Sequence, residues 1–415
     1  MTFRLFVTLS SLNLIAVPAT QLAAQASRYT VADLGTFGGS SSIAFGINNA
    51  GHVAGGASLP GGNQHGALWA MGIMTDTGTL GGPNSSASGP NGNDAMAVYS
   101  DTAVPDPLGE DFCNFGTHVI CTSALWSNGT LTPLPTLGGN NSQVLAINSR
   151  GQMAGISEKS RTDTTCPAPQ KLRYSAALWG ANPNQVDELP PLPGDTVGFA
   201  LGLNDLGQVV GSTGTCANTI VAGLEIGPHA VLWQNGAPIE VGGFGGSVSV
   251  AAAINNRGEV VGASNLAGDS ATPGFFWTQE AGMRKIGAVG TDLSGLPTSI
   301  NNRGQVVGAS CSGVSGSGDC RAFLWENGTM ADLNTLAPSN SPIYMLFALM
   351  INDSGEIVGL GLTSAFEVHA FLATPCYECS ATAETYGNRL SASNRPSTPE
   401  NARRVLQRRY GMHKR

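Results

Sequence analysis

The chain has little charge, and most of that charge is negative. Only 12% of its 415 residues are charged, which is about half the usual fraction. Residues 27–375 hold 11 Lys and Arg against 25 Asp and Glu, a net charge of −14. An acidic body of this kind repels phosphate backbones, so nucleic acid is excluded as the expected partner.

Long hydrophobic runs are also missing, except at the start. Arg4 is followed by an apolar stretch from Leu5 to Val17 and then by the small-x-small sequence Ala24-Gln25-Ala26. This order is typical of a secretory signal peptide. No later stretch is apolar for long enough to cross a bilayer. We therefore expect a signal peptide at 1–26, no transmembrane segment, and a secreted, periplasmic or cell-surface protein.

Groups that could hold a metal or a cofactor are sparse. The six His are scattered, and His229 and His369 share a repeat position that holds Arg321 in another copy. Such variation indicates a local hydrogen bond and not a metal ligand. Gly pairs such as Gly138-Gly139 are not followed by Lys-Ser/Thr, so they indicate turns and not phosphate loops. We expect no metal and no cofactor.

What the chain does contain is one pattern of about 50 residues written seven times. Its sharpest element is an apolar residue followed by Asn, two variable residues and Gly, as in Ile254-Asn255-Asn256-Arg257-Gly258. A degenerate copy of this element at Pro90-Asn91 has Asp94 in place of the Gly. Self-similarity at this period indicates supersecondary units that stack to bury their cores. The Asn residues of the seven copies are Asn48, Asn91, Asn148, Asn204, Asn255, Asn301 and Asn352.

Each copy predicts four short antiparallel strands, which we call A, B, C and D. Strand A ends at the Asn, strand B reads like Glu259-Val260-Val261-Gly262, strand C ends in an aromatic such as Trp179, and strand D precedes Gly or Pro. Asn-Gly pairs such as Asn128-Gly129 close hairpins between C and D. All six Trp occupy strand C, which indicates packing between units.

The order of these signals predicts how the chain closes. An unmatched D strand, Tyr29 to Gly35, opens the mature chain, and the last C strand, His369 to Leu372, has no D strand after it. A ring benefits from this offset because closure removes exposed sheet edges. We therefore predict an all-β fold, a seven-bladed β-propeller over 27–375 whose N-terminal strand closes the last blade. A β-solenoid is the alternative.

The repeats resemble the HAF repeat. His369-Ala370-Phe371 is a literal copy of the triplet that names this family, and Asp33-Leu34-Gly35-Thr36-Phe37-Gly38-Gly39 matches the other half of its signature. The resemblance covers residues 29–375. It implies an exported bacterial repeat protein and carries no assigned activity or functional residues.

Eight Cys in an exported chain predict disulfides. The proposed pairs are Cys113 with Cys121, Cys311 with Cys320, Cys376 with Cys379, and Cys166 with Cys216 across neighbouring repeats. The alternative for Cys376 and Cys379 is a redox or metal pair. Residues 376–415 form a separate, basic tail that we expect to be disordered, with a possible short helix over 399–410.

Catalysis in the central channel is disfavoured if strand A lines it. The seven A strands contain no Asp, Glu, His, Lys, Arg, Cys or Tyr, and acid–base or nucleophilic chemistry needs such groups. If the strand order were reversed, the D strands would form a ring of acids around the channel, a possible cation site. The simpler reading puts these acids at the outer edge. They are Asp33, Asp76, Glu188, Glu240 and Asp332.

The loops between strands B and C vary most, and variable loops on a rigid scaffold are common sites of binding. This loop is short in the first unit and long in the second (101–122) and third (158–173). The alternative is that the long loops are insertions with no ligand. The candidate contacts are Asp111, Phe112, Phe115, His118, Lys159, Arg161, Lys171 and Arg173.

We therefore expect an exported, monomeric binding or scaffolding propeller whose ligand is a polysaccharide or a protein. One alternative is a hydrolase or lyase with catalytic groups on loops, such as Asp111, His118 or Asp163. The other is a structural envelope protein without a ligand.

Overall fold

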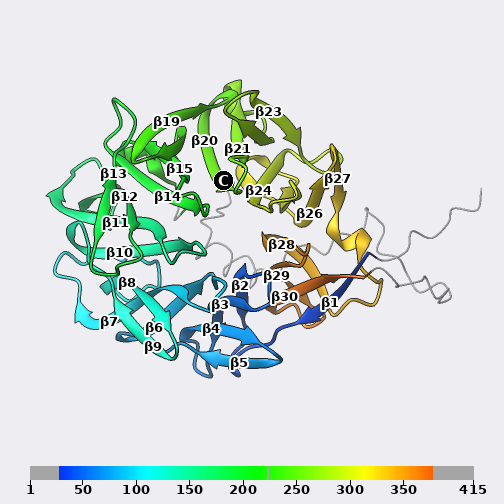
Figure 1. Ribbon diagram of the computed structural model, residues 1–415, viewed down its shortest axis with the longest axis horizontal. Coiled ribbons are helices and arrows are strands. Elements are labelled where there is room, and N and C mark those ends of the chain that lie inside the picture. Colours follow the sequence, from blue (N-terminus) through cyan, green and yellow to red (C-terminus); the bar gives the residue numbers. More distant parts are fainter. Residues whose placement is uncertain (1–27, 222–223, 226, 377–415) are drawn as a thin grey trace, which may run out of the picture.

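The computed structural model describes residues 28–221, 224–225 and 227–376, and they form a ring of seven four-stranded antiparallel sheets (Figure 1). The predicted seven-bladed propeller is confirmed, and the solenoid alternative is wrong. The predicted signal peptide at 1–26 and nearly all of the basic tail lie outside the described residues. None of the helices within the described ranges has the length and apolar character needed to span a bilayer.

The first six blades follow one another along the chain. Blade 1 contains β2 (Ser42–Ile47), β3 (Val53–Ser58), β4 (Gln64–Ala70) and β5 (Ile73–Asp76). Blade 2 contains β6 (Gly81–Ser88), β7 (Met96–Pro105), β8 (Val119–Ser127) and β9 (Thr130–Pro133). Blade 3 contains β10 (Gly138–Ile147), β11 (Met153–Thr162), β12 (Leu172–Trp179) and β13 (Val186–Leu189). Blade 4 contains β14 (Val197–Leu203), β15 (Val209–Gly214), β18 (His229–Gln234) and β19 (Ala237–Gly242).

Blade 5 contains β20 (Gly245–Ile254), β21 (Val260–Leu266), β22 (Gly274–Thr278) and β23 (Gly282–Gly287). Blade 6 contains β24 (Ser294–Ile300), β25 (Val306–Cys311), β26 (Cys320–Glu326) and β27 (Thr329–Asp332). The remaining elements lie in the loops. They are α1 (Cys216–Thr219), the hairpin of β16 (Ile220–Val221) and β17 (Leu224–Glu225), and the 3-10 turns η1 (Ala267–Asp269), η2 (Val314–Gly316) and η3 (Leu333–Leu336).

Blade 7 is closed by the N-terminal strand, as predicted. It contains β28 (Ile343–Ile351), β29 (Ile357–Thr363), β30 (Val368–Pro375) and β1 (Tyr29–Asp33). Strand β1 pairs antiparallel with β30, from Tyr29 opposite Pro375 to Asp33 opposite Phe371. In every blade the A strand lies nearest the centre and the D strand lies at the rim (Figure 1). The reversed order, with the D-strand acids facing the channel, is therefore wrong.

The Trp column packs between blades, as predicted. All six Trp are buried, and Trp179 and Trp233 are fully so. The Trp179 indole N–H donates to the Pro135 carbonyl at 2.8 Å, and the Trp233 indole N–H donates to the Pro190 carbonyl at 2.7 Å. Both carbonyls follow the outer strand of the preceding blade. A buried indole thus provides apolar area and a hydrogen bond across the same interface.

The repeated Gly of the B strands, as in Val260-Val261-Gly262, is required by a close contact with the neighbouring A strand. In six blades the A strand has a register shift three residues before its Asn, for example between Ala251 and Ala253. This β-bulge moves a main-chain carbonyl over the B strand, so that a Cβ on Gly262 would overlap the Val250 oxygen. Blade 2 has no shift at this place, and there Val98 replaces the Gly. The repeated Gly is therefore the partner of the bulge.

The repeated Asn forms a ring that joins all seven blades. Within its own turn, the Asn301 Oδ1 accepts the N–H groups of Arg303 and Gln305 at 3.1 and 3.0 Å. Its Nδ2 donates to the carbonyl oxygen of Asn352, the equivalent Asn of the next blade, at 3.0 Å. The same link runs from every repeat Asn to the next, and the Asn352 Nδ2 closes the circle on the Asn48 oxygen at 2.9 Å. The sequence indicated only the turn.

Candidate functional site: the loop platform of blades 2 to 4

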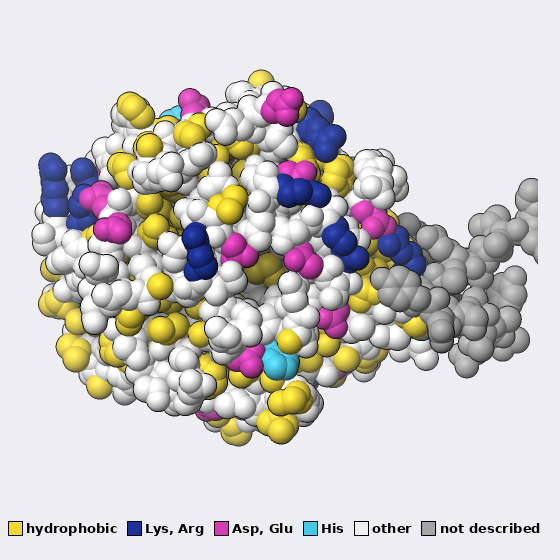
Figure 2. All heavy atoms as spheres, in the orientation of Figure 1, with side chains coloured by type: hydrophobic (Ala, Val, Ile, Leu, Met, Phe, Trp, Pro, Cys, Tyr) yellow, Lys and Arg dark blue, Asp and Glu magenta, His cyan; other side chains and the backbone are white. Residues whose placement is uncertain are grey.

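The channel wall carries almost no titratable group. The inner strands β2, β6, β10, β14, β20, β24 and β28 contain no Asp, Glu, His, Lys, Arg or Cys, as expected. The one addition is Tyr344, because β28 begins before the strand that the sequence predicted. Figure 2 shows hydrophobic surface inside the central hollow and charged side chains around its mouth. The inner strands therefore offer no acid–base pair for chemistry in the channel.

The His of the repeats makes local hydrogen bonds at the rim, as the sequence indicated. The His369 Nδ1 lies 2.9 Å from an oxygen of Asp33, and the His65 Nδ1 lies 2.8 Å from an oxygen of Asp76. In both pairs the His begins strand C and the Asp ends strand D of the same blade. The two halves of the repeat signature thus meet side by side. No group of three or more potential metal ligands occurs within the described ranges.

The strongest departure from seven-fold regularity is a set of B–C loops in blades 2, 3 and 4. We call the loops 106–118, 163–171 and 215–228 the loop platform; residues 222–223 and 226 within it are not described. The disulfide Cys113–Cys121 staples the first loop, and Cys166–Cys216 joins the second loop to the third. These two pairings and Cys311–Cys320 are confirmed. Cys376 is disulfide-bonded, but Cys379 lies outside the described residues.

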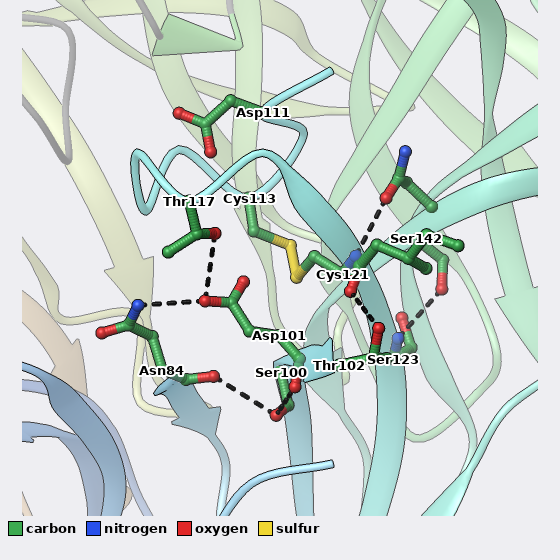
Figure 3. The surroundings of a disulfide bond; sticks show 12 residues. Asn84, Ser100, Asp101, Thr102, Asp111, Cys113, Thr117, Cys121, Ser123 and Ser142 are labelled. Carbon is green, nitrogen blue, oxygen red and sulfur yellow. Dashed lines mark hydrogen bonds between the residues drawn. A yellow bond between two sulfur atoms is a disulfide. The ribbon is translucent and has the colours of Figure 1, made fainter. Parts of the chain in front are cut away.

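The base of the first loop is a buried polar cluster beside the disulfide (Figure 3). Asp101 is 1% exposed, and one of its oxygens accepts from the Asn84 Nδ2 at 3.0 Å and from the Thr117 hydroxyl at 3.2 Å. Burial raises the pKa of Asp101, although these hydrogen bonds oppose the rise. The cluster fixes the C-terminal end of the loop, at Thr117, against strand β7.

Aromatic contacts fasten the loops to the blades beneath them. Phe115 stacks on Tyr99, with ring centroids 5.7 Å apart. Phe112 meets the edge of Tyr174 of blade 3 at 6.4 Å, and the Tyr174 hydroxyl lies 2.6 Å from that of Thr219 of blade 4. Side chains from three successive blades therefore form one packed unit, in which Phe112 and Phe115 are partly buried.

A second buried cluster links the first two loops through two carboxyl groups. Glu110 of the blade 2 loop and Glu158 in the middle of β11 are both 0% exposed. One oxygen of Glu110 accepts the main-chain N–H groups of Lys171 and Leu172, at 2.5 and 2.7 Å. Gln170 Nε2 lies within hydrogen-bond distance of both carboxyl groups, 3.1 Å from Glu110 and 2.8 Å from Glu158. This cluster connects loops that are about 60 residues apart in the sequence.

Burial, and then the neighbouring carboxylate of Glu110, raise the pKa of Glu158 to about 8. The sequence analysis did not select these two residues. A usable signal was present, because Glu158 occupies the strand position that holds Asp101 one repeat earlier. Both acids are the last residue in the buried half of their strand, where a carboxyl group needs hydrogen-bond partners.

Most of the predicted contact residues hold the platform together. Among the cations, Lys159 pairs with Glu188 at 2.7 Å, Arg173 pairs with Asp163 at 3.0 Å, and the Lys171 Nζ donates to the Leu108 carbonyl. Asp111 accepts from the Gly116 N–H, and the His118 Nδ1 lies 3.0 Å from the Gly109 oxygen. Of the predicted contact residues, those that are exposed are His118 and Lys171 on the platform and Arg161 beside it on β11. Their role as ligand contacts stays a prediction.

The residues suggested for loop-borne catalysis are each bonded within their own loop. Asp163 accepts from the Thr165 hydroxyl at 2.6 Å and is paired with Arg173. The Thr165 hydrogen bonds, and then Arg173, lower the pKa of Asp163. A carboxyl group held in its ionised form by such partners is a structural anion and a poor proton donor at neutral pH.

No family model and no curated protein matches the sequence. Among solved structures, one of puromycin hydrolase is 11% identical with a TM-score of 0.49, and it covers 82% of this chain and 51% of that chain. The β-propeller domain of the Trilobed protease from Pyrococcus furiosus is 10% identical with a TM-score of 0.45, covering 86% of this chain and 99% of that chain. A gluconolactonase from Xanthomonas campestris is 11% identical with a TM-score of 0.37, covering 85% and 93%. The chain therefore spans about half the length of puromycin hydrolase, and what it has in common with these proteins is the propeller fold.

Proposed function

We propose that the protein is an exported binding or scaffolding propeller whose platform face engages a polysaccharide or a protein. The observation that carries the proposal is that three loops from successive blades are fastened to one another by a disulfide, a buried carboxylate and aromatic contacts. Loops that only connect strands have no need of such links, whereas a recognition surface gains affinity from being held in one shape before the ligand arrives. The HAF-repeat resemblance supports export.

The absence of acid–base groups from the inner strands supports binding over catalysis in the channel. The exposed side chains of His118 and Lys171 on the platform, and of Arg161 beside it, provide hydrogen-bond donors that suit hydroxyl, carboxylate or carbonyl groups of a ligand. Lys171 and His118 already touch main-chain carbonyls, so their positions are fixed before binding.

The test is thermal unfolding of the oxidised protein, residues 27–415, against a panel of polysaccharides, cell-wall fragments and soluble envelope proteins. A ligand specific for the folded state stabilises it by about 2.7 kcal/mol at a hundredfold excess over its Kd. We expect the double variant Arg161→Ala/Lys171→Ala to weaken that shift. The matched control is Arg257→Ala, an exposed Arg in an A–B turn on the opposite side of the blades.

Four outcomes separate the alternatives. A shift that the platform variant weakens and the control does not supports the proposal. A shift that both variants leave intact moves the binding site away from the platform. A ligand that is cleaved during the assay supports the hydrolase or lyase alternative, and no shift across the panel supports a structural envelope protein.

A further inference from the structure

The carboxyl pair beneath the platform has an unusual hydrogen-bond balance. Gln170 Nε2 carries two hydrogens but lies near three acceptors, one oxygen each of Glu110, Glu158 and Leu172. The other oxygen of Glu110, Oε2, is buried and has no hydrogen-bond partner among the described residues. Two ionised carboxylates in this arrangement would leave acceptors without donors, which is costly in a buried site. One additional proton corrects the balance.

The proton belongs on Glu158. Glu110 is the better anion, because one of its oxygens receives two main-chain N–H groups that cannot turn away, whereas Glu158 receives only one, from Asn141 at 2.9 Å. A protonated Glu158 carboxyl becomes a donor, and Glu110, which shares the Gln170 amide with it, has a buried oxygen that lacks one. The Gln170 amide can then use its two hydrogens on the remaining acceptors.

No neighbouring cation replaces this proton. On the same hairpin, Lys159 is paired with Glu188 and Arg173 with Asp163, while the Lys171 Nζ bonds to a carbonyl. From the blade 2 loop, Asp106 adds a further carboxylate, because the Asn141 Nδ2 lies 3.0 Å from an oxygen of Asp106 and 3.0 Å from one of Glu158. The charged groups packed around Glu158 therefore disfavour its ionised form.

We propose that Glu110 and Glu158 form a proton-dependent latch that fastens the blade 2 loop to the blade 3 loop. While the pair holds one proton, the Glu110 carboxylate keeps its hydrogen bonds from the main-chain N–H groups of Lys171 and Leu172. Loss of the proton puts two negative charges in one dry site, and the loops relieve the repulsion by separating.

The pH window follows from linkage. Glu158 has a pKa of about 8 in the closed latch and an ordinary value of 4.5 once the loops open to water. A carboxyl with a raised pKa contributes its full stabilisation below the ordinary value, and the contribution is lost as pH rises to the raised value. The opening constant should therefore increase about tenfold per pH unit between about 5 and 8, and level off above 8.

The test is hydrogen exchange of the whole oxidised protein at pH 5, 6, 7, 8 and 9, read at the Lys171 and Leu172 amides. The variant Glu158→Gln is a neutral mimic of the protonated carboxyl, because its amide can donate to Glu110 while its oxygen accepts from Asn141. Dividing the exchange rate of the natural protein by that of Glu158→Gln at each pH removes the base catalysis of exchange itself. The control Asp101→Asn removes the other buried acid at this strand position and should leave the ratio unchanged.

We expect the ratio to rise by up to about 1,000-fold between pH 5 and pH 8, three units at about tenfold each. A ratio that changes by less than about threefold overturns the latch. If Glu158→Gln does not fold, carboxyl-carbon NMR of the natural protein decides instead: titration of Glu158 above pH 7 supports the latch, and titration below pH 6 refutes it.

The consequence for ligand binding rests on the proposed function: affinity at the platform should fall as pH rises through this window. The exchange measurement needs no ligand, so the two ideas can fail separately. An intact latch without any ligand in the panel defeats the proposed function alone. A ligand whose affinity is independent of pH, together with a flat exchange ratio, defeats the latch alone.

Discussion

The ring of Asn residues makes a sharp prediction about how the blades are held together. The Asn301 side chain is 4% exposed and makes four hydrogen bonds, two to N–H groups of its own turn, one to Gln305 and one to the Asn352 carbonyl of the next blade. Substitution to Asp keeps the oxygen that the turn needs. It replaces the donor facing Asn352 by a second acceptor, so Asn301→Asp removes the link between blades and leaves the turn bonds in place.

The expected cost is set by the carbonyl left behind. A buried acceptor without a donor costs about 1–3 kcal/mol, and burial of a carboxylate without a cation adds to it. We expect Asn301→Asp to lower the free energy of unfolding by about 2–4 kcal/mol at pH 7. Gln305 offsets little of the loss, because its Nε2 already donates to Glu326 at 2.9 Å and cannot turn to the new carboxylate without giving up that bond. The matched control is Asn182→Asp, in an exposed turn where the Asn oxygen also accepts an N–H two residues on. We expect that change to cost under about 0.5 kcal/mol.

The assay is urea unfolding of the oxidised protein followed by tryptophan fluorescence, since all six Trp are buried in strands at the blade interfaces. A lower midpoint with an unchanged slope reports a loss of stability and not a change in the denatured state. If the two Asp variants lose the same free energy within about 0.5 kcal/mol, the ring adds nothing beyond turn formation, and the reasoning is refuted.

Three further predictions concern positions where the structure gives a matched control. Gly308→Ala should lower the free energy of unfolding in urea by roughly 2 kcal/mol or more, because the added Cβ overlaps the Leu296 carbonyl at the bulge. The control Gly287→Ala, at φ +83 in open space, should cost only about 1 kcal/mol. Equal costs would contradict the bulge explanation. Arg321→Met should cost about 3–5 kcal/mol, because Arg321 is 6% exposed and its loss removes the cation paired with the buried carboxylate of Asp292. Arg257→Met, at an exposed ion pair, should cost under about 1 kcal/mol. A small loss at Arg321 would show that the remaining hydrogen bonds of Asp292, such as that from Ser310, are enough to hold its charge. Replacing Cys166 and Cys216 by Ala should lower the free energy of unfolding by roughly 2–4 kcal/mol, as expected for a disulfide that closes a 50-residue loop. Protease should then cleave the platform before it cleaves the blades. Equally fast cleavage over the whole chain would argue that the platform is not a separate unit.

The sequence by itself determined the architecture, because the repeat signals are local and each has a single physical meaning. The Asn-x-x-Gly turns, the Val-Val-Gly strands and the Trp column are readable from spacing alone, and the offset of one D strand favoured a closed ring over an open solenoid. Three disulfide pairs were also predictable, since two joined near neighbours and the third followed from the cysteines that remained.

Tertiary structure alone decided what those signals do across blade boundaries. The Asn that forms a turn also binds the next blade, and the Gly of strand B is needed because a carbonyl from strand A lies over it. Both contacts join residues that are distant in the sequence, so no additional pattern within one copy of the repeat predicts them. The pairing of Glu110 with Glu158 was hidden for the same reason: the two residues lie 48 positions apart, in loops of irregular length. Their ionisation depends on burial and on each other, and burial is a property of the assembled blades.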